Sequence, residues 1–461
     1  MKIGILPLGR PTFDVSYAQE KLTGMLAALD VTGHTICGPR NLLFDAAETR
    51  AALDDLGSQS VDRLLLLQVT FTDASMTVEA ANAIDVPLSI WAVPEPRIGG
   101  RLRLNAFCGL NLASHALGLA GKRFSWMYAD PDDQVGPRLA TMLDDVEGVL
   151  PMSVTEQTPK GSERAEEIVR TVRGKRIGRI GEHPVGFDTC AYDAENLKAL
   201  TGVEVDALEI DGLFDTARNA KRGEVSNVRK LVAADLFNLD QVDQQELDRS
   251  LRLKVALDEI RGRAKYDAFA IRCWPETFTE YGGAVCGPVS MLGEARVPCA
   301  CEADVYGAVT QLILQEAAQE PVFLADLVDM DIDDGTGVVW HCGQAPLSMR
   351  DDAVAAQATV HTNRKMPLLY EFTLKPGRVT FLRLSQAHGQ TRFVIASGKM
   401  LRRPMAFTGT SGVVRFDNPV GDVLNNVMAS GLEHHMALAY GDHRELLRQV
   451  AGVMGLPVLE L

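Results

Sequence analysis

The sequence predicts an α/β protein, with two doubly wound units followed by an antiparallel region whose expected form is a small barrel. Two observations along the 461 residues support this fold class. Short apolar segments alternate with amphipathic helical segments through the first two thirds of the chain, which is typical of parallel sheets covered by helices. From about Ala358 onward, apolar and polar residues alternate with a period of two, which is typical of antiparallel strands.

The first unit is predicted at residues 1–155. Its expected strands cover residues 2–8, 34–38, 63–69 and 88–93, and amphipathic helices are expected at 17–29 and 74–84. Pro, Thr, Ser and Gly then gather around residues 151–162, and this composition indicates a linker. We therefore place the first domain boundary there.

The second unit, at residues 156–345, repeats the same alternation. Its expected strands cover residues 176–180, 203–210, 266–272, 295–300 and 321–325, and its helices include a long charged one at 244–264 and a more apolar one at 303–318. The third unit, at residues 346–461, begins with an expected antiparallel meander of strands at 369–374, 379–384 and 392–400. Helix, strand and helix are expected over 420–461.

The charge and hydropathy of the chain exclude several classes of protein. Its 46 Lys and Arg against 61 Asp and Glu give a net charge of −15 at pH 7, which repels nucleic acids and anionic membrane surfaces. No apolar run approaches the roughly 20 residues of a membrane span, and the first five residues are interpreted as a strand rather than a signal peptide. We therefore expect a cytoplasmic protein with no nucleic-acid or membrane partner.

The cysteines do not predict a disulfide framework or a structural zinc site. There are eight in a long chain, and no paired CxxC motif is present. Cys299 and Cys301 form a single CxC between apolar residues. Since free cysteine commonly behaves as a small buried hydrophobe, we interpret both as core residues at a strand end, with metal ligation as the alternative.

Polar side chains follow several of the predicted strands, where ligands bind in open α/β sheets. In chain order these residues are Arg272, Trp274, Glu302, Asp326 and His341, and the pair His434 and His435 precedes a last strand-like run at 436–440. Two carboxylates and the histidines form a set of oxygen and nitrogen donors, which suits divalent Mn, Fe, Co or Zn with open positions for a substrate.

Each of these residues also has an alternative structural interpretation. Glu302 can stabilise a helix N-terminus, Asp326 can cap a helix, and any of the histidines can be a buried residue bonded to the backbone. The adjacent His434 and His435 are expected to point to opposite faces of a strand, so that only one of them reaches the cleft.

Other catalytic motifs are absent from the sequence. There is no GxGxxG, no phosphate-binding loop with a lysine and no GxSxG elbow, so dinucleotide binding, P-loop chemistry and serine hydrolysis are not indicated. His361, His388 and His443 have polar neighbours and are expected at the surface.

Five segments resemble the L-fucose isomerase and L-arabinose isomerase superfamily, and more closely its L-fucose isomerase-like branch. They are AIRCWPE at 270–276, PCACEADVYGA at 298–308, FLAD at 323–326, WHCG at 340–343 and HHMALAYGD at 434–442. The resemblance implies two Rossmann-like domains, a C-terminal β-barrel-like domain, and a homo-oligomer with its active site near a subunit interface.

The resemblance also implies a metal site and a reaction. A Mn²⁺-type ion, with Mg²⁺, Co²⁺ or Zn²⁺ as alternatives, would be held by Glu302, Asp326 and His435, and His341 matches a ligand found in arabinose isomerases. The reaction is the interconversion of an aldose and a ketose through an ene-diolate, with Glu302 and Asp326 as catalytic groups. Arg272, Trp274 and His434 are the candidate substrate contacts, with packing and a structural ion pair as alternatives for the first two.

Two other functions remain open from the sequence. One is a sugar-binding or sugar-sensing protein without catalysis, since two α/β lobes also form such clefts. The other keeps the metal but performs epimerisation or aldol cleavage through the same ene-diolate.

Overall fold

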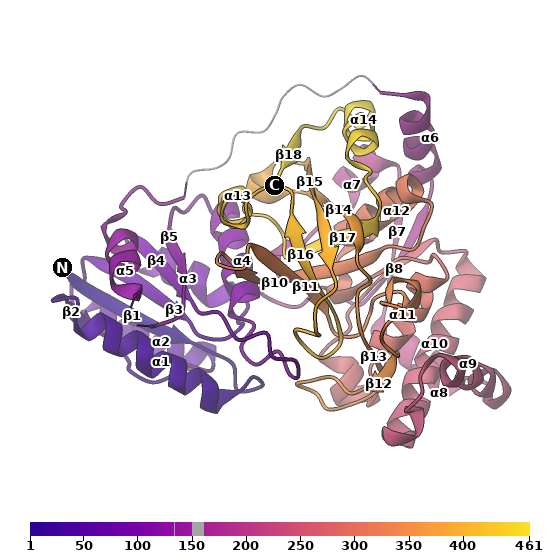
Figure 1. The fold of residues 1–461 in the computed structure, drawn as a ribbon, viewed down its shortest axis with the longest axis horizontal. Helices are drawn as coiled ribbons and strands as arrows, with labels where there is room; N and C mark the ends of the chain where they lie inside the picture. Colours follow the sequence, from indigo (N-terminus) through magenta and orange to yellow (C-terminus); the bar gives the residue numbers. More distant parts are fainter. Residues whose placement is uncertain (133, 150–160) are drawn as a thin grey trace.

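Three β-sheets organise the residues that the computed structural model describes, which are 1–132, 134–149 and 161–461 (Figure 1). A five-stranded parallel sheet lies near the N-terminus, on the left of Figure 1, and a four-stranded parallel sheet lies with its helices on the right. Between them is a nine-stranded mixed sheet, formed by the last third of the chain. The predicted α/β class is confirmed at this level.

The N-terminal sheet has the strand order β2-β1-β3-β4-β5, and its pairings are parallel. The strands are β1 (Lys2–Leu8), β2 (Thr35–Cys37), β3 (Arg63–Gln68), β4 (Leu88–Ala92) and β5 (Ser125–Tyr128). The helices of this region are α1 (Val15–Asp30), α2 (Ala46–Gly57), α3 (Ser75–Ala83), α4 (Ala106–Leu119) and α5 (Val135–Asp144). Every residue of β3 is buried, as a central parallel strand with both faces covered requires.

The four-stranded sheet has the order β7-β6-β8-β9, also parallel. The strands are β6 (Arg176–Ile180), β7 (Glu204–Leu208), β8 (Ala268–Ile271) and β9 (Cys299–Ala300). The helices are α6 (Glu163–Val172), α7 (Ala194–Thr201), α8 (Ile210–Arg218), α9 (Arg222–Asp235), α10 (Gln244–Ala264), α11 (Cys286–Glu294) and α12 (Val305–Ala318). The helix predicted at 244–264 is confirmed, and the Asp243 side chain caps it by accepting the backbone N–H groups of Gln245 and Glu246.

The nine-stranded sheet has the order β12-β13-β16-β11-β10-β17-β14-β15-β18. The strands are β10 (Phe323–Asp331), β11 (Thr336–His341), β12 (Gln357–Thr359), β13 (Leu369–Thr373), β14 (Gly377–Ser385), β15 (Arg392–Leu401), β16 (Thr410–Phe416), β17 (His435–Tyr440) and β18 (Val458–Glu460). Helices α13 (Val420–Ser430) and α14 (Arg444–Met454) flank β17 in the sequence. The predicted helix, strand and helix at the C-terminus are confirmed, and β18 follows them.

The structure differs from the predicted organisation in three respects, of which the simplest is that the strand predicted at 295–300 is only the two-residue β9. The strand predicted at 321–325 is the longer β10, which pairs antiparallel with β11 and β17 and so belongs to the nine-stranded sheet. An apolar run shows that a strand is buried but not which strands pair with it. The predicted meander holds for the antiparallel β14 and β15, whereas β13 pairs in parallel with β16.

The barrel-like form and the domain limits stay predictions. Strand β15 pairs with β16 as well as with β14, so the nine-stranded sheet folds back on itself at this point. The boundary predicted at 155/156 falls within residues 150–160, outside the described residues.

Helix α4 joins the N-terminal sheet to the nine-stranded sheet. It is buried along most of its length, and one hydrophobic cluster contains core residues of both sheets. Two of its polar side chains bond to backbone carbonyls before β17, Asn111 Nδ2 to Leu432 at 2.6 Å and Ser114 Oγ to Met428 at 2.9 Å. The helix therefore fixes the approach of the N-terminal sheet to the strand that carries His435.

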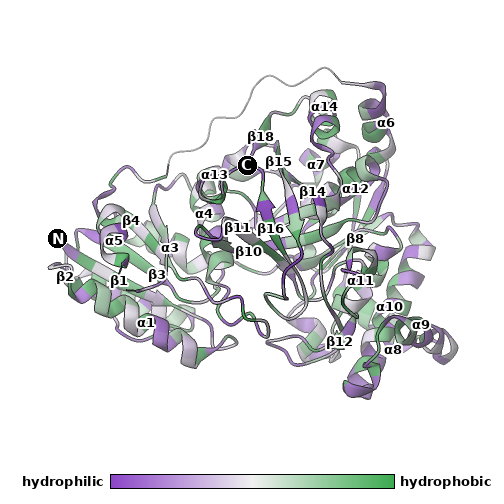
Figure 2. Ribbon diagram, viewed as in Figure 1, coloured by the Kyte–Doolittle hydropathy of each residue, from purple (hydrophilic) through white to green (hydrophobic). Residues whose placement is uncertain are grey.

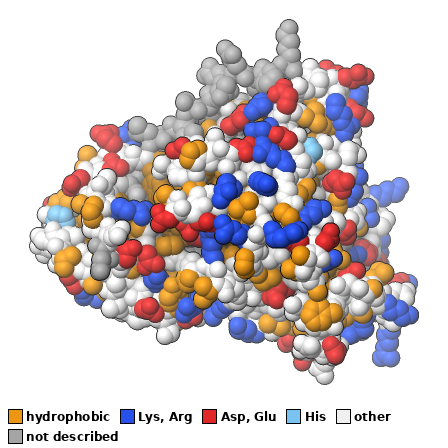
Figure 3. Space-filling model, viewed as in Figure 1, with side chains coloured by type: hydrophobic (Ala, Val, Ile, Leu, Met, Phe, Trp, Pro, Cys, Tyr) orange, Lys and Arg blue, Asp and Glu red, His pale blue; other side chains and the backbone are white. Residues whose placement is uncertain are grey.

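The hydropathy of the ribbon agrees with this layered packing. The strands at the centre of each sheet are largely hydrophobic, and hydrophilic residues concentrate on the outer helices and loops (Figure 2). The face in Figure 3 carries charged side chains of both signs, with Lys and Arg gathered over its middle. In the described parts of the chain, no helix combines the length and apolarity needed to cross a bilayer.

Candidate active site

A cavity lies where the three sheets approach one another, beyond the C-terminal ends of β8 and β9 and beside β10 and β11. Its lining draws on all three sheets and includes Arg10, Asn105, Trp274, Glu302, Asp326 and His341. Parallel strands present their carboxyl ends on one edge, and this edge is where open α/β sheets bind ligands. The cavity is therefore the candidate site on topological grounds.

Glu302 enters the cavity from a short 3-10 turn, Cys301–Ala303, which directly follows β9. Both of its carboxylate oxygens accept hydrogen bonds, Oε1 from Trp274 Nε1 at 3.0 Å and Oε2 from His434 Nε2 at 2.9 Å. Burial would raise the pKa of Glu302, but the hydrogen bond and charge of His434 and the hydrogen bond from Trp274 lower it to about 2. The group is held as a carboxylate.

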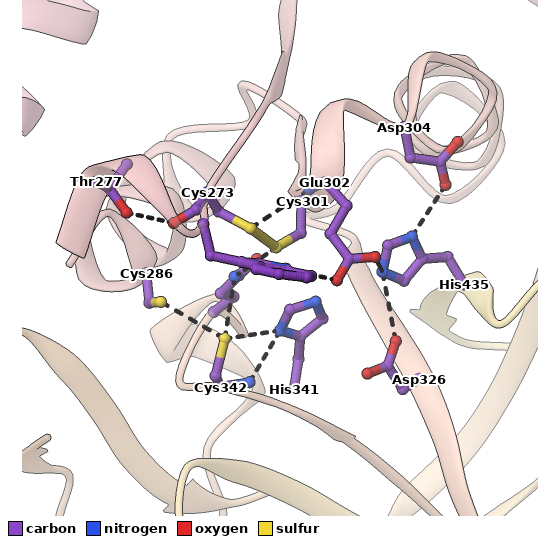
Figure 4. Close-up of a disulfide and its surroundings, with 12 residues drawn as sticks. Cys273, Thr277, Cys286, Cys301, Glu302, Asp304, Asp326, His341, Cys342 and His435 are labelled. Carbon is purple, nitrogen blue, oxygen red and sulfur yellow. Dashed lines mark hydrogen bonds and ion pairs between the residues drawn. A yellow bond between two sulfur atoms is a disulfide. The ribbon is translucent and has the colours of Figure 1, made fainter. Parts of the chain in front are cut away.

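His435 is oriented by a buried ion pair behind it. Its Nδ1 lies 3.0 Å from Asp304 Oδ2, and Asp304 is paired with Arg383 at 2.5 and 3.1 Å. Because the carboxylate accepts the Nδ1 proton, the lone pair of the neutral ring is on Nε2. That atom faces the acidic groups, 3.4 Å from Asp326 Oδ1 and 4.0 Å from Glu302 Oε2 (Figure 4).

Asp326 lies opposite His435 in the register of β10 and β17. Its Oδ1 is buried and has no hydrogen-bond partner among the described residues. One donor atom each of Asp326, His341 and His435 lie within 4.8 Å of one another, and a second such group joins Glu302, His434 and His435 with Cys190. His435 is the member that the two groups share.

These residues fit a divalent ion. An unpartnered carboxylate oxygen and a neutral imidazole nitrogen, both buried, are donors that a bound cation would satisfy. Burial and the neighbouring His434 lower the pKa of His435, so its ring is neutral and available as a ligand. The arrangement of Asp304 behind His435 is the carboxylate support that metal-binding histidines usually have.

His341 also lines the cavity, but its Nδ1 accepts a hydrogen bond, whereas that of His435 donates one. The backbone N–H of Cys342 donates to its Nδ1 at 2.9 Å, which leaves the proton of the neutral ring on Nε2. Nε2 is buried and without a hydrogen-bond partner in the described residues. In this state His341 offers a hydrogen-bond donor to the cavity rather than a metal ligand.

The structure corrects the expectation that only one of His434 and His435 reaches the cleft. Their ring centroids are 3.9 Å apart, and both rings lie beside Glu302. Opposite orientation applies to neighbouring residues within a strand, and β17 begins only at His435. The Glu302 hydrogen bond and charge outweigh burial and raise the pKa of His434.

The two remaining predicted contacts are placed differently from each other. Trp274 lines the cavity and donates to Glu302, as described above. Arg272 does not line it; its Nε pairs with Glu276 at 2.6 Å, and Nη1 donates to the backbone carbonyl of Glu182. This placement matches the structural ion pair that the sequence left open for Arg272.

Several cavity residues carried no signal in the sequence. Arg10, Asn105 and Arg364 line the cavity from loops, and Asn105 Oδ1 is buried without a hydrogen-bond partner among the described residues. His361, expected at the surface, also lines the cavity and packs against Phe278 with ring centroids 5.1 Å apart. A short polar loop looks the same in sequence whether it faces solvent or a cleft, so the fold alone shows these positions.

The cysteines differ from the prediction in one respect. Cys299 is a buried free cysteine, as expected, but Cys301 forms a disulfide with Cys273 at the edge of the cavity (Figure 4). The two partners lie just after the neighbouring strands β8 and β9, whose pairing no spacing motif reveals. Cys286 and Cys342 are a second close pair, with their sulfur atoms 3.5 Å apart.

Comparisons with known proteins show the family of this chain. Residues 4–153 match the model of the fucose/sulfoquinovose isomerase N-terminal domain, and residues 339–461 match that of the L-fucose isomerase C-terminal domain. Curated relatives include the sulfoquinovose isomerases of Alkalicoccus urumqiensis, 30% identical over 99% of this chain and 98% of that one, and of Clostridium sp. (strain MSTE9), 31% identical over the same shares. A sulfoquinovose isomerase of Priestia aryabhattai is 29% identical over 98% of this chain and 97% of its own.

Likeness to solved structures adds no argument. An ABC transporter solute-binding protein from Burkholderia multivorans matches 69% of this chain and 94% of its own with 10% identity and a TM-score of 0.19. A likeness this low does not support the sugar-binding alternative.

Proposed function

The chain belongs to the fucose/sulfoquinovose isomerase family, and from that premise we propose that it interconverts the aldose and ketose forms of a sulfonated hexose in this cavity. Membership of the family makes it a sugar isomerase acting between an aldose and a ketose. The metal dependence, the residue roles and the sulfonated substrate are our proposal. The observation that carries the metal site is the position of His435 Nε2, which lies 3.4 Å from Asp326 Oδ1 and 4.0 Å from Glu302 Oε2.

Glu302, Asp326 and His435 are the residues that we propose to hold a divalent ion, with Mn²⁺ as the expected metal. The support is the chemistry of the donors, two carboxylates and an imidazole whose Nε2 is free. When bound, such an ion supplies Lewis acidity at the carbonyl and hydroxyl oxygens of the sugar. His341 is left out of this set, because its hydrogen bond from Cys342 favours a protonated Nε2.

The carboxylates of Glu302 and Asp326 are proposed to move the proton between C2 and C1 through an ene-diolate. Asp326 Oδ1 has no hydrogen bond to give up and is free to accept a proton. Glu302 is kept ionised by hydrogen bonds from His434 and Trp274, and His434 is placed to exchange a proton with it. His341 Nε2–H is positioned to donate to an oxygen of the substrate that carries developing negative charge.

Two arginines at the other end of the cavity support an anionic substrate. Arg10 and Arg364 both approach the Trp274 ring, with guanidinium carbons 5.8 and 5.9 Å from its centroid. Arg10 is ion-paired with Asp73, whereas the Arg364 guanidinium has no acidic or hydrogen-bonding partner among the described residues. Burial and the neighbouring Arg10 lower the pKa of Arg364, so an anion placed here would relieve an uncompensated charge.

The arrangement of the cavity matches the two ends of sulfoquinovose. This sugar has its aldehyde carbon at one end and a sulfonate at the other. Trp274 lies between the carboxylate and histidine residues and the arginines, where its ring can pack on the apolar face of the sugar. Arginine is the side chain best suited to bind a tetrahedral oxyanion, since its planar group donates two parallel hydrogen bonds.

The test is ketose formation by purified protein with sulfoquinovose, glucose and fucose, each with added Mn²⁺ and after treatment with a chelator. We expect turnover of sulfoquinovose well above that of the neutral sugars, loss of activity in chelator, and recovery on adding Mn²⁺. Full turnover in metal-free protein would contradict the metal site. Equal turnover of neutral and sulfonated sugars would contradict the role of the arginines.

The cellular and oligomeric features remain part of the proposal. The acidic composition supports a cytoplasmic protein without nucleic-acid partners. Membership of the family supports a homo-oligomer with its site near a subunit interface. Light scattering and cell fractionation test these two features independently of the assay.

A further inference from the structure

The disulfide between Cys273 and Cys301 lies against Glu302, and the proposed reaction does not use it. Cys273 precedes Trp274 and Cys301 precedes Glu302, so the bond ties together the two chain segments that meet at the carboxylate, with the cysteine Cα atoms 5.8 Å apart (Figure 4). Both cysteines line the cavity. The bond therefore borders the substrate cavity, and both cysteines are buried in this form.

The bonded form constrains the backbone at Glu302. Glu302 and Ala303 have φ angles of 56° and 54°, in the left-handed region that residues other than glycine rarely adopt. Residues in this conformation persist only where the surroundings hold them. Here the Cys301 bond holds the segment on one side, and the Glu302 N–H points to Cys273 Sγ at 3.4 Å.

In this constrained form Glu302 belongs to only one of the two groups of possible metal-binding side chains. Its donor group comprises His434, His435 and Cys190, whereas Asp326, His341 and His435 form the other group. Trp274 and His434 occupy both oxygens of the Glu302 carboxylate. Releasing Cys301 would let the segment 301–303 relax and bring the carboxylate toward Asp326.

We propose that Cys273 and Cys301 form a reversible thiol–disulfide site whose state sets the position of Glu302. A low-molecular-weight disulfide, such as oxidised glutathione, closes the pair, and a low-molecular-weight thiol opens it. The opened form binds the divalent ion more tightly than the closed form. The effect on the ion depends on the proposed function, whereas the exchange itself does not.

The exchange is a balanced two-electron reaction. One cysteine thiolate attacks the small disulfide, forms a mixed disulfide and releases the first small thiolate. The second cysteine then attacks the protein sulfur of the mixed disulfide, so that the Cys273–Cys301 bond forms and the second small thiolate leaves. The protein pair loses two electrons and two protons, and the small disulfide gains them as two thiols.

A neighbouring pair provides a matched control. Cys286 and Cys342 also line the cavity, and their sulfur atoms are 3.5 Å apart without a bond. Gln344 Nε2 lies between the pairs, 3.4 Å from the sulfur atoms of both Cys301 and Cys342. Neither Cys286 nor Cys342 is adjacent to Glu302 in the chain. The Cys286→Ser substitution should therefore leave the effect of the Cys273–Cys301 bond on Mn²⁺ binding unchanged.

The experiment compares wild type, Cys273→Ser, Cys301→Ser and Cys286→Ser at equilibrium in glutathione buffers from reducing to oxidising. Thiols are counted by alkylation and mass spectrometry, and Mn²⁺ affinity is measured by calorimetry on the same samples. We expect wild type and Cys286→Ser to lose two thiols on oxidation, at the Cys273 and Cys301 peptides, and to bind Mn²⁺ about tenfold more weakly, the scale seen when supports of ligands are altered. The Cys273→Ser and Cys301→Ser proteins should bind Mn²⁺ equally in all buffers.

Hydrogen exchange of residues 301–304 in metal-free protein supplies a readout that needs neither ion nor substrate. Exchange should be faster in reduced than in oxidised wild type, because the segment is released. An unchanged thiol count across the buffers, an exchange rate that ignores the redox state, or an oxidation response retained in Cys273→Ser and Cys301→Ser would overturn the proposal. Absence of sugar isomerisation with these readouts as expected would instead count against the proposed function alone.

Discussion

The two ends of the cavity are built in different ways. At one end, Asp326 and His435 lie within paired strands, and Glu302 follows a strand directly. Hydrogen bonds and ion pairs orient several of the side chains there, as in the run from Arg383 through Asp304 to His435. At the other end, Arg10 and Arg364 come from loops, and the Arg364 guanidinium reaches no partner among the described residues.

This difference separates the site into a fixed part and an adjustable part. Proton transfer and metal binding need atoms placed to within fractions of an ångström, which paired strands and buried ion pairs provide. Recognition of a charged substituent tolerates more movement, and loops can change in sequence without disturbing the sheets. We infer that the strand residues set the reaction and the loop residues select the sugar.

The largest expected effect follows from removing a carboxylate at the fixed end. Glu302→Gln and Asp326→Asn should each reduce turnover by about 10²–10⁴, since each removes a proton-transfer group and a ligand charge at nearly constant volume. Steady-state assays check the rates, and thermal melting checks that the fold persists. A variant that keeps a tenth of the wild-type rate would move the role to another residue.

Substitutions of the adjacent His434 and His435 should show which of the two residues is a metal ligand and which only supports a ligand. His435→Ala should remove most of the bound metal, because its Nε2 faces both acids, whereas His434→Ala should remove little, because His434 bonds only to Glu302. Metal content of both purified variants decides the assignment. Equal loss, or greater loss in His434→Ala, would reverse it.

The adjustable end should show an effect that depends on the substrate. Arg364→Met should raise the KM for a sulfonated sugar by roughly 10- to 100-fold, the scale of a charge-assisted hydrogen bond of ~1.5–3 kcal/mol, and should leave a neutral aldose unaffected. Arg403→Met is the matched control, because Arg403 is exposed, pairs with Asp334 and lies outside the cavity lining. A similar change with both sugars would mean that Arg364 supports the fold rather than the sulfonate.

The smallest expected effect on Mn²⁺ binding is that of Asp304, which supports His435. Asp304→Asn keeps the volume of the side chain but weakens the acceptor of His435 Nδ1 and the partner of Arg383. Mn²⁺ affinity should fall by about tenfold, the lower end of what supports of metal ligands contribute. Calorimetry measures this, and a full loss of folded protein would show that the Arg383 pair serves mainly stability.

The sequence by itself determined the fold class, most of the strands and the donors at the fixed end. Hydrophobic periodicity is a local property, so α10 and strands β1 to β4 of the N-terminal sheet could be placed from it to within a few residues, whereas the short β5 was missed. Polar residues that follow a strand are also visible in sequence, and this is how Glu302 and Asp326 were selected, whereas the resemblance favoured His435. The family segments joined these scattered positions into one set.

Tertiary structure alone decided which distant segments meet. It placed β10 in the nine-stranded sheet, joined Cys273 to Cys301, and aligned both His434 and His435 beside Glu302. It also brought Arg10 and Arg364, which are 354 positions apart in the sequence, to the Trp274 ring. Both arginines come from loops with no periodic pattern. Side-chain periodicity specifies a face of one element, whereas contacts between elements depend on how all the sheets pack, which no local pattern encodes.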